Sequence, residues 1–200
     1  MESYKTISQP SEEVLFKEKN SKFFSYAFPV SNEDEVKEII LSLKKKHHTA
    51  RHFCYAYQIG TENPSYRVND DGEPNNSAGM PIYGQIQSFE LTNTLIVVVR
   101  YFGGIKLGVG GLMSAYKTAA QLALENSLIT NKTIDINFII SFDYKNLNNV
   151  MRVTKEKNIQ ITSQKMELNC EIEISVPKKN AQNIFTIFSS FYEVIIKKKC

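Results

Sequence analysis

The stretch from residue 94 to residue 116 decides the fold, and its centre reads Arg100-Tyr101-Phe102-Gly103-Gly104-Ile105-Lys106-Leu107-Gly108-Val109-Gly110-Gly111. Before this centre, residues 95–99 form a continuous run of aliphatic side chains, which is the pattern of a strand buried on both faces. After it, apolar residues recur at helical spacing from Leu112 to Leu122. The sequence therefore predicts a buried strand, a glycine-rich link and a helix.

The glycine-rich link has two interpretations. A strand-to-helix link directs unpaired N–H groups and the positive end of a helix dipole at whatever lies in front of it, which favours an anion. The candidate residues for binding an anion or a partner are Arg100, Gly103, Gly104, Lys106, Gly108, Gly110 and Gly111. The spacing matches neither a P-loop nor a dinucleotide fingerprint. A tight structural turn that binds nothing is therefore the alternative.

Composition limits the class of protein. The 200 residues contain 24 basic and 21 acidic side chains, a net charge of +3, and only three cysteines, which are widely spaced. No apolar run is long enough to span a bilayer, and no signal peptide is evident, so we expect a cytoplasmic protein. The odd, scattered cysteines predict neither a disulfide framework nor a Cys-x-x-Cys metal site.

The first 130 residues show further local patterns. Alternation over residues 14–28, interrupted by Lys19-Asn20-Ser21, predicts a hairpin. Ser31-Asn32 followed by Asp34 or Glu35 predicts the start of a helix, and residues 52–57 read as a strand. A second short helix is predicted over residues 81–86, with Ser77 as its cap.

An acidic segment follows the strand at residues 52–57. Asp70, Asp71 and Glu73 lie within four residues of one another, and such oxygen ligands suit Mg²⁺. Their spacing does not match an EF-hand, so a solvated acidic loop is the alternative. Together with His52, these carboxylates are the candidates for a polar cleft. We expect this cleft to meet Arg100 and Lys106 in one functional surface, or Arg100 to form a structural ion pair with one of the acidic residues.

His52 and Cys54 lie on the same predicted strand and point to one face. They suggest a Cys–His pair, but an isolated strand cysteine is more typically a small buried hydrophobe. His48 and His52 have the spacing of a helical metal site, yet the pattern changes from helix to strand between them. We therefore predict no metal ligands there.

The last 70 residues read as a second domain. Strands at residues 134–142, 159–161, 166–176 and 193–196 are interleaved with helices near 147–151 and 184–191, which gives the βαββαβ order of a ferredoxin-like domain. Residues 132–200 hold 11 basic and 7 acidic side chains. Lys197, Lys198 and Lys199 are the candidate nucleic-acid contacts, although a short terminal lysine cluster is often only solvated.

Several motifs together resemble the YigZ/IMPACT family. They are His52-Phe53-Cys54-Tyr55-Ala56-Tyr57, Asp70-Asp71-Gly72-Glu73-Pro74, Ser77-Ala78-Gly79-Met80-Pro81 and the stretch from Val99 to Leu112. The resemblance covers the whole chain. It implies an α+β protein with a domain like domain 2 of ribosomal protein S5 at residues 1–130 and a ferredoxin-like domain at 131–200. The pair is similar to the last two domains of elongation factor G. The family usually has Gly-Thr at Asn76-Ser77 and arginine at Ser114, and losing that arginine weakens the expected grip on phosphate.

The resemblance also directs the functional hypothesis. Eukaryotic members of the family modulate starvation signalling in translation by competing with a kinase regulator. We therefore expect a non-enzymatic binding protein that engages RNA, the ribosome or a translation-associated protein, without a cofactor. The alternative is an enzyme acting on a phosphorylated or nucleotide substrate, with phosphate at the glycine-rich link and Mg²⁺ at the acidic loop.

Overall fold

Five antiparallel strands form the main sheet of the N-terminal part of the chain. In the computed structural model, which describes residues 2–199, the strand order of this sheet is β2-β3-β6-β4-β5. The strands are β2 (Val14–Glu18), β3 (Ser21–Pro29), β4 (His52–Ile59), β5 (Ser65–Asn69) and β6 (Thr94–Tyr101). The chain divides into an N-terminal unit, Tyr4–Lys132, and a C-terminal unit made of the residues from Thr133 onward with the first residues of the chain.

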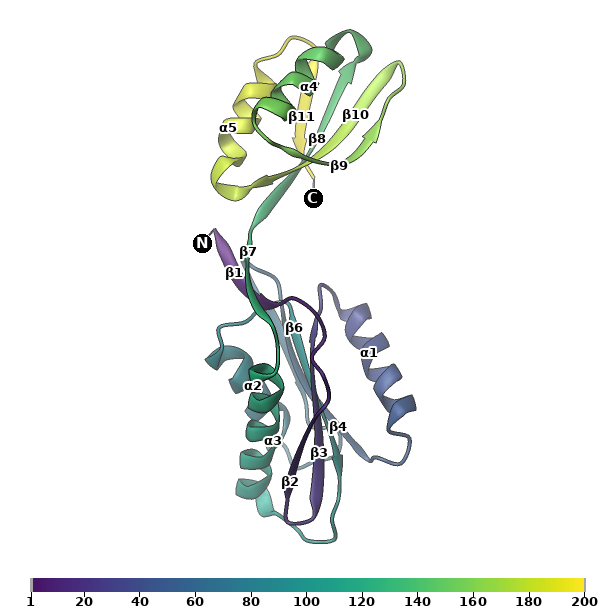
Figure 1. Ribbon diagram of the computed structural model, residues 1–200, viewed down its shortest axis with the longest axis vertical. Helices are drawn as coiled ribbons and strands as arrows, with labels where there is room; N and C mark the ends of the chain where they lie inside the picture. Colours follow the sequence, from purple (N-terminus) through teal and green to yellow (C-terminus); the bar gives the residue numbers. More distant parts are fainter. Residues whose placement is uncertain (1, 200) are drawn as a thin grey trace. The chain divides into compact units, whose positions relative to one another are not determined.

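β6 is the middle strand, and both of its faces are covered. The helix α1 (Glu33–Lys46) packs on one face of the sheet, while α2 (Gly79–Ser88) and α3 (Gly108–Glu125) lie side by side on the other (Figure 1). Every residue of β6 except its last, Tyr101, is buried. The prediction of a strand buried on both faces, followed by a helix, is therefore confirmed.

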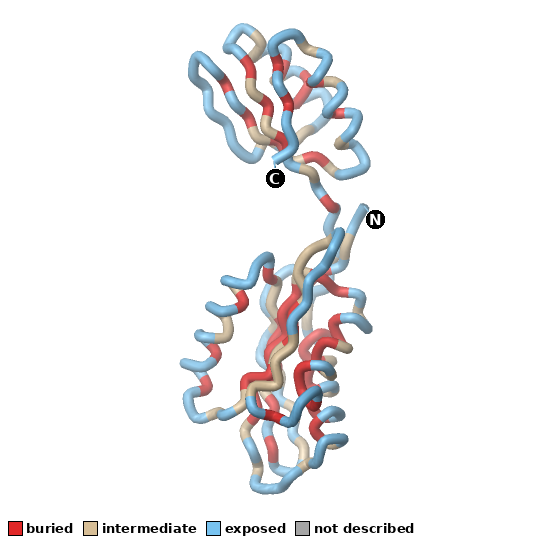
Figure 2. Tube along the Cα trace, turned by 180° about the vertical axis from the view of Figure 1, so that it is seen from behind, coloured by how far each residue is buried: buried red, intermediate tan, exposed pale blue. Residues whose placement is uncertain are grey.

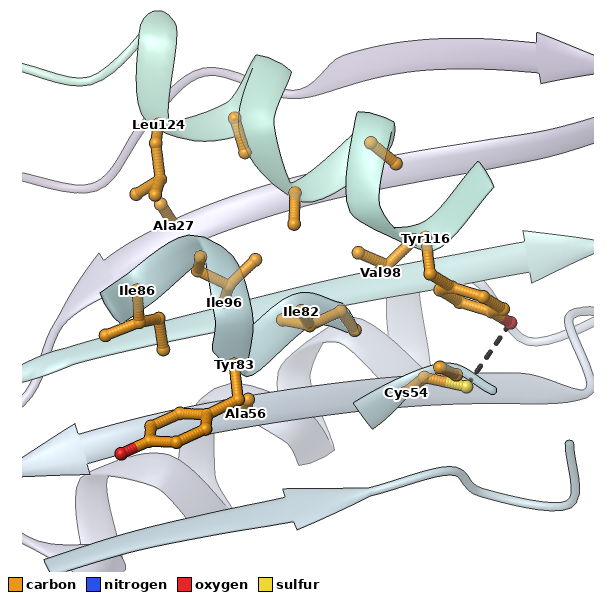
Figure 3. Packing of buried hydrophobic residues seen from close by; sticks show 14 of the residues in the cluster. Ala27, Cys54, Ala56, Ile82, Tyr83, Ile86, Ile96, Val98, Tyr116 and Leu124 are labelled. Carbon is orange, nitrogen blue, oxygen red and sulfur yellow. Dashed lines mark hydrogen bonds between the residues drawn. The ribbon is translucent and has the colours of Figure 1, made fainter. Parts of the chain in front are cut away.

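Two hydrophobic cores result, one on each face of this sheet. Under α2 and α3, Ile96 and Val98 of β6 meet small side chains such as Ala56 and Ala27 and the large ring of Tyr116 (Figure 3). Under α1, the alternate residues Leu95, Val97 and Val99 pack with tyrosine and phenylalanine side chains. The buried positions follow the strands of the sheet in Figure 2. Because successive side chains of β6 point to opposite faces of the sheet, this one strand contributes residues to both cores.

Local sequence signals set several boundaries. Lys19 and Asn20 both have positive φ, the conformation of a two-residue hairpin turn, and they join β2 to β3 as predicted. Asn32 caps α1 by accepting from the backbone N–H groups of Asp34 and Glu35. The Glu35 carboxylate accepts from the backbone N–H of Ser31 in return. These reciprocal bonds satisfy donors that a helix start otherwise leaves unpaired.

Two short strands at the entry and exit of the N-terminal unit are absent from the sequence prediction. β1 (Ser3–Ile7) and β7 (Ile129–Thr133) form a separate two-stranded sheet. Polar and apolar residues alternate only weakly in both strands, so no local periodicity of the sequence predicts them. The predicted role of Ser77 is also wrong, because α2 has no side-chain cap and the Ser77 hydroxyl donates instead to the carbonyl of Pro74 at 2.6 Å.

The C-terminal unit has the predicted βαββαβ order. Its four antiparallel strands lie in the order β11-β8-β10-β9. Its elements are β8 (Asp135–Asp143), a 3-10 turn η1 (Tyr144–Asn146), α4 (Leu147–Glu156), β9 (Gln160–Lys165), β10 (Asn169–Pro177), α5 (Lys178–Ser189) and β11 (Val194–Lys198). A separate core that includes Ile140, Ile172 and Phe188 holds this sheet to its helices. The chain is therefore a mixed α/β protein, with two cores in the N-terminal unit and one in the C-terminal unit.

Candidate functional site

Four connections meet at one end of the N-terminal sheet, which we call the loop end. They are the β2–β3 turn, the α1–β4 link, the loop from Asp70 to Ala78, and the turn from Phe102 to Leu107. The strand register brings them together, because Lys22 pairs with Tyr101 and His52 pairs with Arg100. Every N-terminal residue that the sequence marked as a candidate lies in or beside these connections.

Arg100 is buried at the centre of the loop end. Its Nη1 donates to Glu73 Oε1 at 2.6 Å, and its Nη2 donates to the Ser21 hydroxyl at 3.3 Å. The guanidinium carbon lies 5.5 Å from the ring centroids of both Phe23 and Phe102, so two aromatic rings lie close to the cation. Among the described residues, the Arg100 Nε has no hydrogen-bond partner. The strand thus ends in a cation that is paired inside the protein.

The three acidic side chains are also bonded within the fold. Glu73 Oε1 accepts a second bond, from the hydroxyl of Tyr116. Asp71 accepts from the backbone N–H of Phe53 at 2.7 Å. Asp70 accepts from three backbone N–H groups, those of Asn76, Ala78 and Gly79. The loop carboxylates therefore hold the loop and the start of α2.

These hydrogen bonds and the ion pairs show which of the polar candidate residues contact one another. Glu73 joins Arg100, whereas Lys106 is exposed and forms no ion pair among the described residues. The described part of the chain also contains no cluster of three or more His, Cys, Asp or Glu side chains suited to a metal ion. The geometry at Arg100 is that of the structural ion pair which the sequence left as an alternative.

His52 and Cys54 do not pair with each other. The His52 ring is hydrogen bonded through Nδ1 to the carbonyl of Asp71 at 3.0 Å. The Cys54 thiol lies 3.0 Å from the carbonyl of Asp70 and 3.3 Å from the hydroxyl of Tyr116 (Figure 3). Burial raises the pKa of the Cys54 thiol well above its ordinary range. Cys54 is thus a neutral thiol in a core, as the second interpretation of this strand expected.

The glycines of the turn have different roles. A Cβ on Gly103 would lie 2.1 Å from the carbonyl carbon of Asn20, so only glycine lets the turn approach the hairpin this closely. Gly104 and Gly108 have positive φ. Gly110 and Gly111 lie in the first turn of α3, and neither has a positive φ. Within this stretch a positive φ therefore occurs at Gly104 and Gly108 but not at Gly103, Gly110 or Gly111.

Exposed lysines at the loop end are a feature that the sequence analysis missed. Lys17 and Lys22 lie directly opposite each other on the β2–β3 hairpin, and like charges in that position are destabilising. With Lys19 and Lys106 they form what we call the lysine set. All four are exposed and have no carboxylate within 4.0 Å among the described residues. The two-residue turn fixes the register, so the pairing of Lys17 with Lys22 could have been derived from the sequence.

The C-terminal lysines do not gather on one face. In β11, Lys197 pairs with Ile139 and Lys198 pairs with Phe138, so these two lysines point to opposite faces of the sheet. The ammonium of Lys199 donates to Glu173 at 2.7 Å. Because Glu171 lies two residues before Glu173 on β10, acidic residues share this region with the lysines.

Comparisons with known proteins agree with the motifs. The family model of the Impact N-terminal domain matches residues 19–124. The chain belongs to the IMPACT family. The IMPACT family member YvyE of Bacillus subtilis is 35% identical over 179 residues, covering 90% of this chain and 82% of that protein. The IMPACT family member YigZ of Escherichia coli is 32% identical over 152 residues, covering 75% of this chain and 74% of that protein.

A solved structure has the same arrangement of elements. A crystal structure of a hypothetical protein superposes with a TM-score of 0.75 at 25% identity, covering 98% of this chain and 97% of that one. The similarity to that structure therefore extends through both units of the chain. In the described residues, no helix is both long enough and apolar enough to cross a membrane.

Proposed function

We propose that this protein is a non-enzymatic binding protein of translation that engages RNA, the ribosome or a translation-associated protein through the loop end. The observation that carries the proposal is the lysine set. Lys17 and Lys22 face each other without an acidic partner, which costs stability in the free protein. An anionic partner would remove that repulsion.

The internal bonding of the loop end supports this assignment. Glu73 and Arg100 neutralise each other, and Asp70 and Asp71 are engaged by backbone N–H groups. The surface charge of the turn and hairpin is then dominated by lysines. Lysines that bind phosphates release condensed counterions, which makes a lysine-rich surface suited to RNA or a ribosomal surface.

Family membership supports the connection to translation, because the resemblance implies that eukaryotic members of the IMPACT family act there. The finer fold assignment belongs to the same proposal: an S5 domain 2-like domain over residues 1–130 and a ferredoxin-like domain over 131–200. The βαββαβ order and the strand order β11-β8-β10-β9 support the second of these. A cytoplasmic location follows from a role in translation.

Cosedimentation with purified ribosomes tests the proposal. Binding should weaken as salt rises from about 50 to 200 mM, because each phosphate contact adds to the salt dependence. Lys17→Glu with Lys22→Glu should weaken binding and flatten that dependence. The matched control is Lys155→Glu with Lys157→Glu in the C-terminal unit, which changes the net charge equally. Absence of ribosome binding, or equal loss in both double variants, would contradict the proposal.

A further inference from the structure

The outer surface of α2 and α3 carries almost no charge. α2 contains no charged residue in its 10 residues, and α3 contains only Lys117 and Glu125 in 18. α1, which covers the other face of the same sheet, has eight charged residues in 14: Glu33, Asp34, Glu35, Lys37, Glu38, Lys44, Lys45 and Lys46. Solvent-facing helix surfaces are normally charged or polar, so α2 and α3 depart from the pattern that α1 follows.

Exposed apolar side chains occupy this surface instead. Val109, Met113 and Met80 are 54%, 45% and 40% exposed. Val109, Met113 and Lys117 are spaced four residues apart and so form one row along α3. Depletion of charge together with exposed methionine is typical of the central part of a protein–protein interface. We call this row, together with the exposed side of α2, the α2–α3 surface.

A groove runs between the two helices within this surface. It has a volume of about 470 Å³ and is lined mainly by Pro81, Gly84, Gln85, Ser88, Lys117 and Gln121. A Cβ on Gly84 would have no atom within 4 Å, so the backbone of α2 is open to a close approach here. Lys117 is exposed and has no ion pair among the described residues. The groove is therefore uncharged except for one cation.

We propose that the α2–α3 surface docks an amphipathic helix of another protein, with its apolar side on Val109 and Met113 and a carboxylate at Lys117. The apolar row at helical spacing fits the helix-in-groove mode of recognition. Charge complementarity selects an acidic residue for the position facing the lone lysine. The site lies on α2 and α3, whereas three members of the lysine set, Lys17, Lys19 and Lys22, lie on the β2–β3 hairpin.

A second copy of the chain fits this surface less well. α3 spans Gly108–Glu125, so Lys117 lies at the middle of the helix. A two-fold contact whose axis crosses the middle of α3 would place Lys117 against its own counterpart. Like charges brought together in an interface are unfavourable, so the occupant is a different protein. An RNA strand is also excluded by chemistry, because one lysine on an apolar face offers little to a phosphate backbone.

The test uses isotope-labelled full-length protein and two synthetic peptides as probes. Each peptide has about 18 residues, or five helical turns. Both have a leucine face, and the positions that border this face carry glutamate in one peptide and lysine in the other. The glutamate peptide should shift the backbone NMR signals of α2 and α3 and bind about tenfold more tightly than the lysine peptide. Lys117→Glu should reverse that preference.

Two further variants separate docking from folding. Gly84→Gln places a side chain into the open groove and should weaken binding of the glutamate peptide about tenfold. The NMR spectrum of this variant should remain that of a folded protein. Lys45→Glu on α1 is the control and should leave binding unchanged. Equal binding of both peptides, no binding, or shifts confined to the lysine set would overturn the proposal. So would poly(U) RNA shifting the same signals, or a dimer in sedimentation that Gly84→Gln abolishes.

Discussion

The Arg100 guanidinium and the Glu73 carboxylate form an ion pair that is closed to solvent. Their nearest atoms are 2.6 Å apart, and the two side chains are only 6% and 4% exposed. Glu73 also accepts from Tyr116 of α3, so this pair connects the end of β6, the acidic loop and the middle of α3. The loop end is therefore organised by a buried charge that the protein itself neutralises.

Removal of one partner from this pair should be costly. We expect Glu73→Gln to lower the free energy of unfolding by about 3–5 kcal/mol, because it leaves a buried cation without its counterion. Replacing both residues, with Arg100→Met and Glu73→Leu, should restore much of the loss. Urea denaturation of the three proteins measures this. A single variant as stable as the parent would show that the pair is not needed by the fold.

Gly103 and Gly110 should respond in opposite directions to alanine. Gly103→Ala should destabilise the protein severely, because the new methyl group meets the backbone of Asn20 at 2.1 Å. Gly110→Ala should stabilise it by about 0.5–1 kcal/mol, since Gly110 is helical, has open space around it, and alanine is the better helix former. The melting temperatures of the two variants, compared with that of the parent protein, test this prediction. Equal changes in both would contradict the structure of the turn.

His47 should make stability depend on pH. Burial lowers the pKa of His47 below its ordinary value of 6.5, despite Glu13 at 3.8 Å from its Nε2. The unfolded chain then binds the proton more readily than the folded chain, so stability falls as pH drops below about 6.5 and is retained above it. His47→Gln should flatten this dependence in urea midpoints between about pH 5 and 7. His48→Gln, at an exposed position, is the control and should leave the slope unchanged.

Asp70 should act as a structural residue rather than as a metal ligand. Its carboxylate accepts from three backbone N–H groups around the start of α2. Asp70→Ala should therefore cost about 1–3 kcal/mol of stability, because the N–H groups of the buried residues Ala78 and Gly79 lose their acceptor. Mg²⁺ with or without ATP should leave the melting temperature of the parent unchanged. A ligand at 100 times its dissociation constant would add about 2.7 kcal/mol, and such a rise would support the enzyme hypothesis instead.

Much of the N-terminal fold could be predicted because its signals are local. The aliphatic run of β6, the Lys19-Asn20 turn and the Asn32 cap each depend on a few neighbouring residues. β1 and β7 could not be found in this way. Their residues alternate weakly, and their pairing joins segments about as far apart as the two ends of the unit. Only the three-dimensional structure shows that β1 and β7 pair.

The N-terminal candidate residues gather at the loop end, but the sequence could not predict the bonds that they form. The sequence left an ion pair between Arg100 and an acidic residue as one of two alternatives, and it could not select Glu73 from three neighbouring carboxylates. That selection depends on Tyr116 and on the path of the loop, which are tertiary features. The scarcity of charge on the outer surface of α2 and α3 was visible in the sequence, where Lys117 and Glu125 are the charged residues of the two helices. The structure adds that the two helices lie side by side on one face of the sheet, so that they form one continuous surface.

The opposed Lys17 and Lys22 of the hairpin have a consequence for the energetics of the free protein. Ion pairs weaken as ionic strength rises, whereas repulsion between exposed like charges is relieved by screening. The hairpin should therefore become more stable as salt is added, which is the reverse of the salt dependence expected for binding an anionic partner. Any anion that settles between these lysines stabilises the native hairpin by mass action. Folding and partner binding are thus thermodynamically linked through the ammonium groups of Lys17 and Lys22.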